Sequence, residues 1–164
     1  MLEAVITFLR EKFEIDQLNL LGHSMGGIII GLLSPENITK TILVASPTFS
    51  PYKRMKKYFS KREGTIIDEN GESRIARSDG SVSILNKEFW TEMKEVDPLS
   101  LYKALSSKTN MTYVRALEDH VVTDGDYVSL KDDIDIDYIE IHGDHDFTGK
   151  DRENWLHKMI ELIL

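Results

Sequence analysis

Apolar side chains recur along the chain at spacings that predict helices alternating with short strands. Leu2–Phe13 and Trp155–Ile163 carry apolar residues three and four positions apart, which predicts amphipathic helices. Gly26–Leu33 is apolar on every side, which predicts a helix buried against a sheet. Runs rich in aliphatic residues predict strands. These runs are Gln17–Leu21, Thr41–Ala45, Met111–Leu117 and Ile134–Ile141, and a short helix is expected over Asp126–Leu130. We therefore expect an α/β fold, in which a mainly parallel sheet has helices on both faces.

The middle of the chain has a different pattern. Tyr52–Arg62 is basic and compatible with a helix, and Lys87–Glu95 predicts a second helix that ends at Asp97-Pro98. Asn70-Gly71 and Asp79-Gly80 mark tight turns between short β-rich pieces, which predicts β-hairpins. Because this pattern interrupts the alternation of helices and strands, we expect a small cap or lid insertion here. Its expected bounds are residues 51–98, with residues 1–50 and 99–164 forming the core domain.

Composition and charge exclude several classes of protein. The 164-residue chain has a formal net charge of −8, which argues against a nucleic-acid partner. It contains no cysteine, which excludes a disulfide framework and a thiolate metal site and favours a cytoplasmic location. Glu3 stands where a signal peptide would carry positive charge, and no run reaches the ~18 apolar residues of a membrane span. We expect a cytoplasmic protein with no membrane span.

Ser24 lies in the run GHSMGG (residues 22–27), between a predicted strand and a predicted helix. A serine hydroxyl is a poor nucleophile unless a base accepts its proton and a turn presents it to the substrate. The pattern G-x-S-x-G makes such a turn, since its glycines permit close approach of the backbone. The N-terminus of the following helix also places backbone N–H groups near a developing oxyanion. The competing interpretation is a glycine-rich turn whose serine only caps the helix.

Two later strand ends carry groups that can activate such a serine. The strand over residues 111–117 is followed by EDHVV (118–122), and the strand over 134–141 by HGDHDF (142–147). In parallel α/β sheets, active groups lie beyond the carboxyl ends of strands. Asp119 therefore stands where an orienting carboxylate is expected, and His145 where a general base is expected.

Other residues near these turns stay open as candidates. Asp119 has an alternative role as the cap of a loop, and His142 suits a packing role at its strand end. The other candidates for the acid are Glu118, Asp124 and Asp126. The other candidates for the base are His142, His120, His23 and His157.

The three motifs together resemble those of the α/β-hydrolase superfamily, particularly its small esterases, lysophospholipases and acyl hydrolases. GHSMGG is similar to their nucleophile elbow, EDHVV to their acid turn and HGDHDF to their histidine turn. The order of serine, acid and histidine is also that of the family. The resemblance extends from the first helix to the last, and the middle insertion corresponds to the variable cap of these proteins.

The resemblance implies a serine hydrolase that acts on a small carboxylic ester or thioester, with no cofactor and no metal. Ser24 would attack the carbonyl, His145 would accept and return the proton, and Asp119 would orient the imidazole. The backbone N–H of Met25 would supply one donor of the oxyanion hole. The residues implied to line the substrate site are His23 and Phe147.

Two further patterns allow other interpretations. The run His142–Asp146 resembles the H-x-H-x-D-H pattern of metallo-hydrolases, but Asp144 stands where that pattern needs a second histidine. We therefore expect no metal centre. The basic segment Tyr52–Arg62 can attract an anionic substrate or a phospholipid surface, although a solvated cap helix is the interpretation that we favour.

The beginning of the chain departs from the family pattern. Full members have several strands before the elbow, and a loop after one of them supplies a second oxyanion donor. No residue before Leu2 can do this, and losing one such donor typically costs about 10²–10³ in turnover. The strand Gln17–Leu21 would become a sheet edge, and the helix Gly26–Leu33 would lose part of its cover. The sequence is then a fragment, the product of a truncated gene, or a short form that pairs its open edge in a homodimer. The alternative to an enzyme is a non-catalytic relic or a binding or assembly module.

Overall fold

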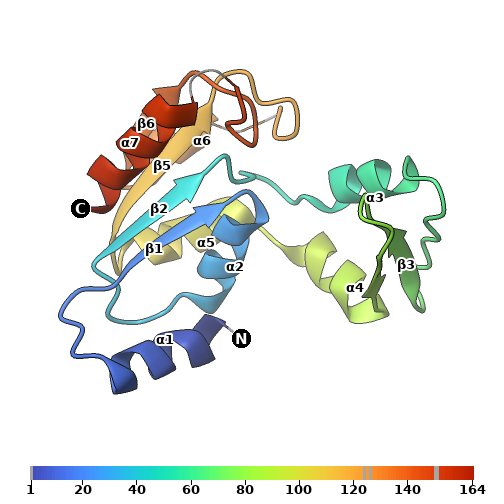
Figure 1. Cartoon of the computed structure of the whole chain (residues 1–164), viewed down its shortest axis with the longest axis horizontal. Coiled ribbons are helices and arrows are strands. Elements are labelled where there is room, and N and C mark those ends of the chain that lie inside the picture. Colours follow the sequence, from blue (N-terminus) through green and yellow to red (C-terminus); the bar gives the residue numbers. More distant parts are fainter. Residues whose placement is uncertain (1, 124, 126, 150–151) are drawn as a thin grey trace. The chain divides into compact units, whose positions relative to one another are not determined.

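The computed structural model describes residues 2–123, 125, 127–149 and 152–164 of the chain (Figure 1). The chain divides into two compact units. The core unit is Met1–Thr48 together with Pro98–Leu164, and the middle unit is Phe49–Asp97. Among the helices that are described, none has the length and the apolar content needed to cross a membrane.

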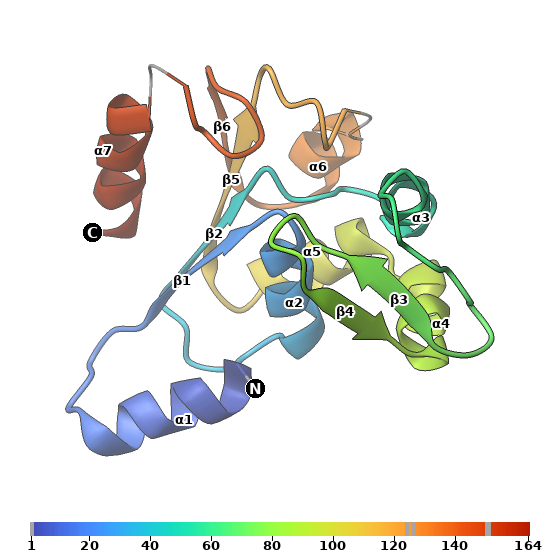
Figure 2. The same ribbon diagram turned by 45° about the vertical axis from the view of Figure 1, so that its right-hand side comes forward.

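The core unit contains a four-stranded sheet in which all neighbouring strands are parallel. The strands, in spatial order, are β1 (Asn19–His23), β2 (Lys40–Val44), β5 (Asn110–Ala116) and β6 (Asp137–Ile141). The helices are α1 (Leu2–Lys12), α2 (Met25–Leu33), α5 (Pro98–Ser106), α6 (Tyr127–Asp133) and α7 (Arg152–Ile163). Figures 1 and 2 show α7 on one side of this sheet and α2 and α5 on the other. The expected fold class, a mainly parallel sheet with helices on both faces, is confirmed.

Alternating side chains of the central strands fill the core on both faces of the sheet. Leu43 and Tyr113 pack in one buried cluster with Tyr102 of α5. Val114, the next residue along β5, belongs to a second buried cluster that includes Met159 of α7. Successive residues of a strand point to opposite faces, so a sheet covered on both sides needs continuous apolar runs. This explains why the central strands are apolar at nearly every position.

Helix α5 is the main element that the apolar pattern does not predict. Asp97-Pro98 is a helix-ending signal, and α4 does end at Glu95, but Pro98 is also the first residue of α5. Proline suits this position because the first residue of a helix needs no backbone N–H. Strand boundaries also shift, since β6 begins at Asp137 and not at Ile134.

β1 lies at one edge of the sheet, as expected from the sequence. Within the described residues, no strand pairs with its outer side. The expected partial exposure of the neighbouring apolar helix is also present, because Ile29 and Leu32 of α2 are 51% and 53% exposed. The core unit therefore has an edge strand, β1, and a helix with two exposed apolar side chains.

The middle unit contains helices and a small antiparallel sheet. Its elements are α3 (Tyr52–Ser60), β3 (Ser73–Ala76), β4 (Val82–Leu85) and α4 (Lys87–Glu95). Trp90 of α4 is fully buried and donates its indole N–H to Ser73 Oγ at 2.9 Å. The rings of Tyr52, Phe59 and Phe89 contact Trp90 edge-on. These aromatic residues therefore form a core within the middle unit.

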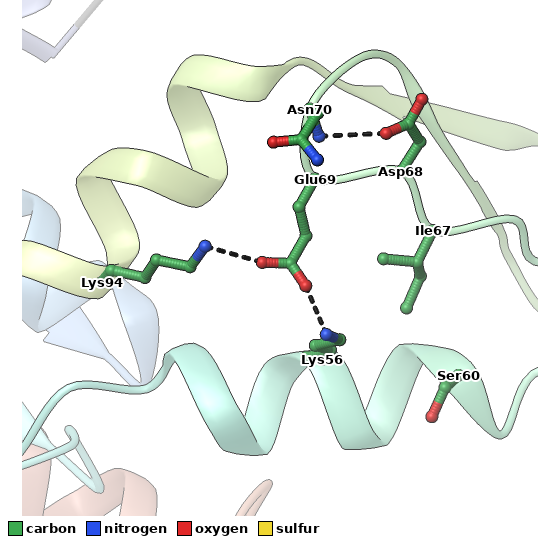
Figure 3. A pocket seen from close by; sticks show the side chains of 7 residues that line it. All are labelled: Lys56, Ser60, Ile67, Asp68, Glu69, Asn70 and Lys94. Carbon is green, nitrogen blue, oxygen red and sulfur yellow. Dashed lines mark hydrogen bonds and ion pairs between the residues drawn. The ribbon is translucent and has the colours of Figure 1, made fainter.

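A polar cleft of about 500 Å³ lies in the middle unit, and Figure 3 shows the side chains that line it. Glu69 lies at its centre and binds the ammonium groups of Lys56 and Lys94, the latter at 2.8 Å. The hydroxyl of Tyr52 donates to the same carboxylate. Hydrogen bonds from Lys56, Lys94 and Tyr52 lower the pKa of Glu69 from 4.5 to about 2. The cluster ties the loop around Glu69 to both helices of the middle unit.

Replacing Glu69 with glutamine is expected to lower the melting temperature near neutral pH by removing the charge that both ammonium groups bind. The pKa of Glu69 is lower in the folded protein than its ordinary value of 4.5, so its stabilisation is present above about pH 4.5. This stabilisation is lost as the pH falls toward about 2. Melting curves followed by circular dichroism across this range should show the two proteins converging in acid.

The matched control is Glu72→Gln, because Glu72 is exposed and lies 3.6 Å from Arg74 in a surface pair. Exposed pairs of this kind contribute little. A difference in melting temperature between Glu69→Gln and the natural chain that stays constant down to about pH 2 would contradict the attribution to the charge of Glu69.

Candidate active site

Ser24 occupies a sharp turn between β1 and α2. Its backbone angles are φ 53° and ψ −123°, a conformation that costs free energy for a residue with a Cβ. Its N–H donates to the carbonyl of Val44 at 2.8 Å, so the turn begins directly where the β1–β2 ladder ends. A Cβ on Gly22 would lie 2.7 Å from the backbone nitrogen of Gly27. The turn therefore requires glycine at position 22, as the sequence motif indicated.

A chain of hydrogen bonds joins Ser24 to the two residues expected at later strand ends. Ser24 Oγ lies 2.9 Å from His145 Nε2, and His145 Nδ1 lies 2.8 Å from Asp119 Oδ2. Asp119 follows β5 and His145 follows β6, so the three groups meet at the carboxyl ends of parallel strands. The acid–imidazole–hydroxyl order permits proton transfer from the hydroxyl to the imidazole.

The carboxylate of Asp119 is held in a buried and fully hydrogen-bonded position. Its side chain is 4% exposed, and Oδ1 accepts the N–H groups of Val121 and Val122, each at 2.7 Å. Burial raises the pKa of Asp119, but hydrogen bonds from His145 and from the two N–H groups outweigh burial and lower it below its usual value. Asp119 therefore stays ionised beside His145 Nδ1, which fixes the proton on that nitrogen.

Side-chain contacts stabilise the histidine turn on both sides of His145. The carboxylate of Asp144 accepts the N–H of Thr148 at 2.9 Å and its hydroxyl at 2.8 Å. Phe147 has φ 51°, is buried, and stacks on Trp155 of α7 with ring centroids 4.7 Å apart. The described contacts of Phe147 are thus with the core beneath α7, whereas the sequence implied a position lining the substrate site.

His23 contacts the histidine turn directly. Its Nε2 lies 2.7 Å from the backbone carbonyl of His145, and the two imidazole rings are 4.9 Å apart. A carbonyl oxygen only accepts hydrogen bonds, so His23 Nε2 carries the proton in this contact. The sequence placed His23 near the site but gave no signal for this bond, because it joins residues far apart in the chain.

Met25 is the first residue of α2, so its N–H has no carbonyl partner four residues earlier within the helix. Ser24 is the helix N-cap and makes no capping bond with its side chain. The hydroxyl is thus free of a capping role, against the competing interpretation, and the N-terminus of α2 presents an N–H and a positive dipole end beside it.

Several of the alternative acids and bases have other surroundings in the described part of the chain. Glu118 accepts from His142 Nδ1 at 2.7 Å and from the N–H of Gly143, so it links the acid turn to the histidine turn. His120 and His157 are exposed. Two further candidates for the acid, Asp124 and Asp126, lie outside the described residues. The link through Glu118 was not expected, since the sequence treated Glu118 only as a substitute for Asp119.

From the run His142–Asp146 we expected no metal centre, and the described part of the chain contains a group of side chains whose spacing could hold a metal ion. His23, His145 and Asp146 bring their ligand atoms within 4.8 Å of one another. Of the run His142–Asp146, His145 and Asp146 belong to this group, whereas His142 binds Glu118 and Asp144 binds Thr148.

The fold and this hydrogen-bond chain define an α/β protein with a serine, a histidine and an aspartate at the carboxyl ends of its strands. Residues 1–43 match the family described as "Alpha/beta hydrolase of unknown function (DUF915)". A comparison with curated proteins gives no match.

Solved structures share the fold at low sequence identity. The esterase domain from a Rhodothermus marinus protein matches with a TM-score of 0.67 at 16% identity, over 97% of this chain and 65% of that one. The α/β hydrolase GrgF from Penicillium sp. sh18 matches with a TM-score of 0.69 at 14% identity, over 99% of this chain and 68% of that one. Est1E from Butyrivibrio proteoclasticus, with ferulic acid bound, matches with a TM-score of 0.69 at 17% identity, over 99% of this chain and 66% of that one. The chain therefore has the α/β-hydrolase fold and spans about two thirds of the length of these proteins.

Proposed function

We propose that the protein is a serine hydrolase that cleaves a carboxylic ester or thioester through an acyl-enzyme intermediate. The observation that carries the proposal is the chain of hydrogen bonds from Ser24 Oγ through His145 to Asp119, at 2.9 and 2.8 Å. Similarity to an esterase domain and to Est1E supports the choice of an ester as substrate. One fold carries many activities, so the proposal of a serine hydrolase rests on the geometry of these three residues and not on the fold alone.

The proposed reaction has two halves. Ser24 Oγ attacks the carbonyl carbon while His145 Nε2 takes the hydroxyl proton, and the same nitrogen returns that proton to the departing alcohol or thiol. A water then attacks the acyl-enzyme, with His145 again as base, and releases the carboxylic acid and Ser24. Asp119 stabilises the imidazolium in both halves, and the N–H of Met25 donates to the oxyanion.

Other parts of the proposal concern the substrate and the assembly. We propose a small acyl ester as substrate, in line with the lysophospholipase-like resemblance. The cytoplasmic location, the cap role of the middle unit and the homodimer through β1 stay predictions from the sequence.

Hydrolysis of p-nitrophenyl esters with acyl chains from acetyl to palmitoyl tests the proposal, with Ser24→Ala as the matched control. We expect the natural chain to hydrolyse at least one ester, and Ser24→Ala to do so no faster than buffer with an inert protein. If the natural chain is folded by circular dichroism and yet no faster than Ser24→Ala, the protein is the non-catalytic alternative.

Replacing His23 with phenylalanine is expected to lower kcat about 5-fold while leaving KM nearly unchanged, because one neutral hydrogen bond is worth about 1 kcal/mol. The hydrogen bond that this variant removes joins His23 Nε2 to the backbone carbonyl of His145 and holds it against the nucleophile turn. His23→Gln keeps an N–H donor at a similar reach and should recover most of kcat. Steady-state kinetics of both variants check this, and equal losses in the two would assign the effect to packing.

A further inference from the structure

We propose that a divalent transition-metal ion of the zinc type binds His23, His145 and Asp146 and inhibits the enzyme reversibly. The inference rests on the proposed function, since inhibition requires that His145 be the base. The ion is an inhibitor in this proposal and takes no part in the reaction.

The three side chains have the chemistry and the spacing of a metal site. Two imidazoles and one carboxylate suit zinc, whose bonds of about 2.0–2.2 Å place its ligand atoms roughly 3.3 Å apart. The ligand atoms here lie within 4.8 Å of one another, so the side chains would have to move closer together to bind one ion. Asp146 is exposed and His23 is partly exposed, which gives an ion a route from solvent.

In the neutral form of each histidine, its hydrogen bond places the proton on one nitrogen and leaves the lone pair on the other. Asp119 binds His145 Nδ1 at 2.8 Å, so the lone pair of His145 is on Nε2. A carboxylate on the far nitrogen is also the usual support of a metal-binding histidine. His23 Nε2 donates to the carbonyl of His145, so the lone pair of His23 is on Nδ1. The neutral imidazole is the form that a metal ion binds.

Metal binding and catalysis compete for one lone pair. His145 Nε2 lies 2.9 Å from Ser24 Oγ and accepts its proton in the proposed reaction. An ion on this nitrogen would remove the acceptor and leave Ser24 without a base. A chelator should then restore full activity, and Mg²⁺, which prefers oxygen ligands, should inhibit much less than Zn²⁺.

Titration with zinc tests the proposal, with each variant compared with its own metal-free rate. Asp146→Asn removes the carboxylate, and we expect half-inhibition to need at least about 10-fold more zinc. His142→Ala is the matched control, because His142 lies in the same turn as His145 and Asp146, is outside the group and binds Glu118. It should leave the zinc dependence unchanged. Inhibition that is the same in Asp146→Asn and in the natural chain would overturn the proposal.

A binding measurement separates this proposal from the proposed function. Isothermal titration of Zn²⁺ into Ser24→Ala needs no activity, and we expect one ion per chain, with clearly weaker binding in the Ser24→Ala, Asp146→Asn double variant. Binding that depends on Asp146 in a natural chain that hydrolyses no ester would refute the function and the inhibition but keep the metal site. Binding that is absent, or that does not depend on Asp146, would refute the site.

Discussion

Replacing His145 with alanine is expected to lower kcat for ester hydrolysis about 10⁶-fold, to the level of Ser24→Ala. The reason is geometric, because His145 Nε2 is the basic group that lies at 2.9 Å from Ser24 Oγ among the described residues. Members of a triad act as a unit, so the Ser24→Ala, His145→Ala double variant should be no slower than either single variant. Steady-state rates of the three variants, measured on the best ester of the panel, check this.

The control for this prediction is His142→Ala. His142 lies three residues from His145, is 78% exposed on its side chain and pairs with Glu118. Surface pairs of this kind are worth little, so the rate should fall by no more than about 5-fold. Equal losses in His142→Ala and His145→Ala, or losses that multiply in the double variant, would contradict the proposed role of His145.

Replacing Gly27 with alanine is expected to destabilise the protein by about 1–3 kcal/mol and to reduce activity with it, because the new methyl group is overpacked. A Cβ on Gly27 would lie 2.1 Å from Ser46 Oγ and 2.8 Å from its Cβ. Ser46 is fully buried just beyond β2 and has little room to move. Chemical denaturation followed by fluorescence, together with ester hydrolysis, measures both effects.

Gly26→Ala is the matched control at the neighbouring position. No atom lies within 4 Å of a Cβ built on Gly26, so alanine should be tolerated and the helix should gain slightly in propensity. The result is informative because Gly26, and not Gly27, is the second glycine of the G-x-S-x-G pattern. Destabilisation by Gly26→Ala equal to that by Gly27→Ala would show that this packing of the turn is wrong.

Most of the architecture could be predicted from the pattern of apolar residues. The parallel strands are buried on both faces, so they read as continuous apolar runs that end where the sheet ends. Helix α5 is not predicted because Pro98 serves in the sequence analysis only as a signal that the preceding helix has ended. Proline is also common at the first position of a helix. Local sequence allows Pro98 either to follow the end of one helix or to begin the next. The burial of Tyr102 and Leu105 in the core shows that a helix follows Pro98.

The candidate site was predictable where it depends on strand ends and not where it depends on loop conformation. Asp119 and His145 follow from the rule that parallel strands present their carboxyl ends at one edge. The motif implies a position for Phe147 at the substrate site, and in the structure Phe147 is buried, has φ 51° and stacks on Trp155. The bond from His23 to the backbone of His145 and the approach of Asp146 depend on the same turn. The spacing of apolar residues along the chain does not predict contacts of this kind.

The most direct test of the central claim is the mass of the intact protein after reaction with a fluorophosphonate probe. The probe forms a bond only with a serine that is activated as a nucleophile. We expect one added group per natural chain, located on Ser24 by peptide mapping, no labelling of Ser24→Ala, and much slower labelling of His145→Ala. A natural chain that is folded and stays unlabelled, or a label that persists in Ser24→Ala, would contradict the proposed role of Ser24.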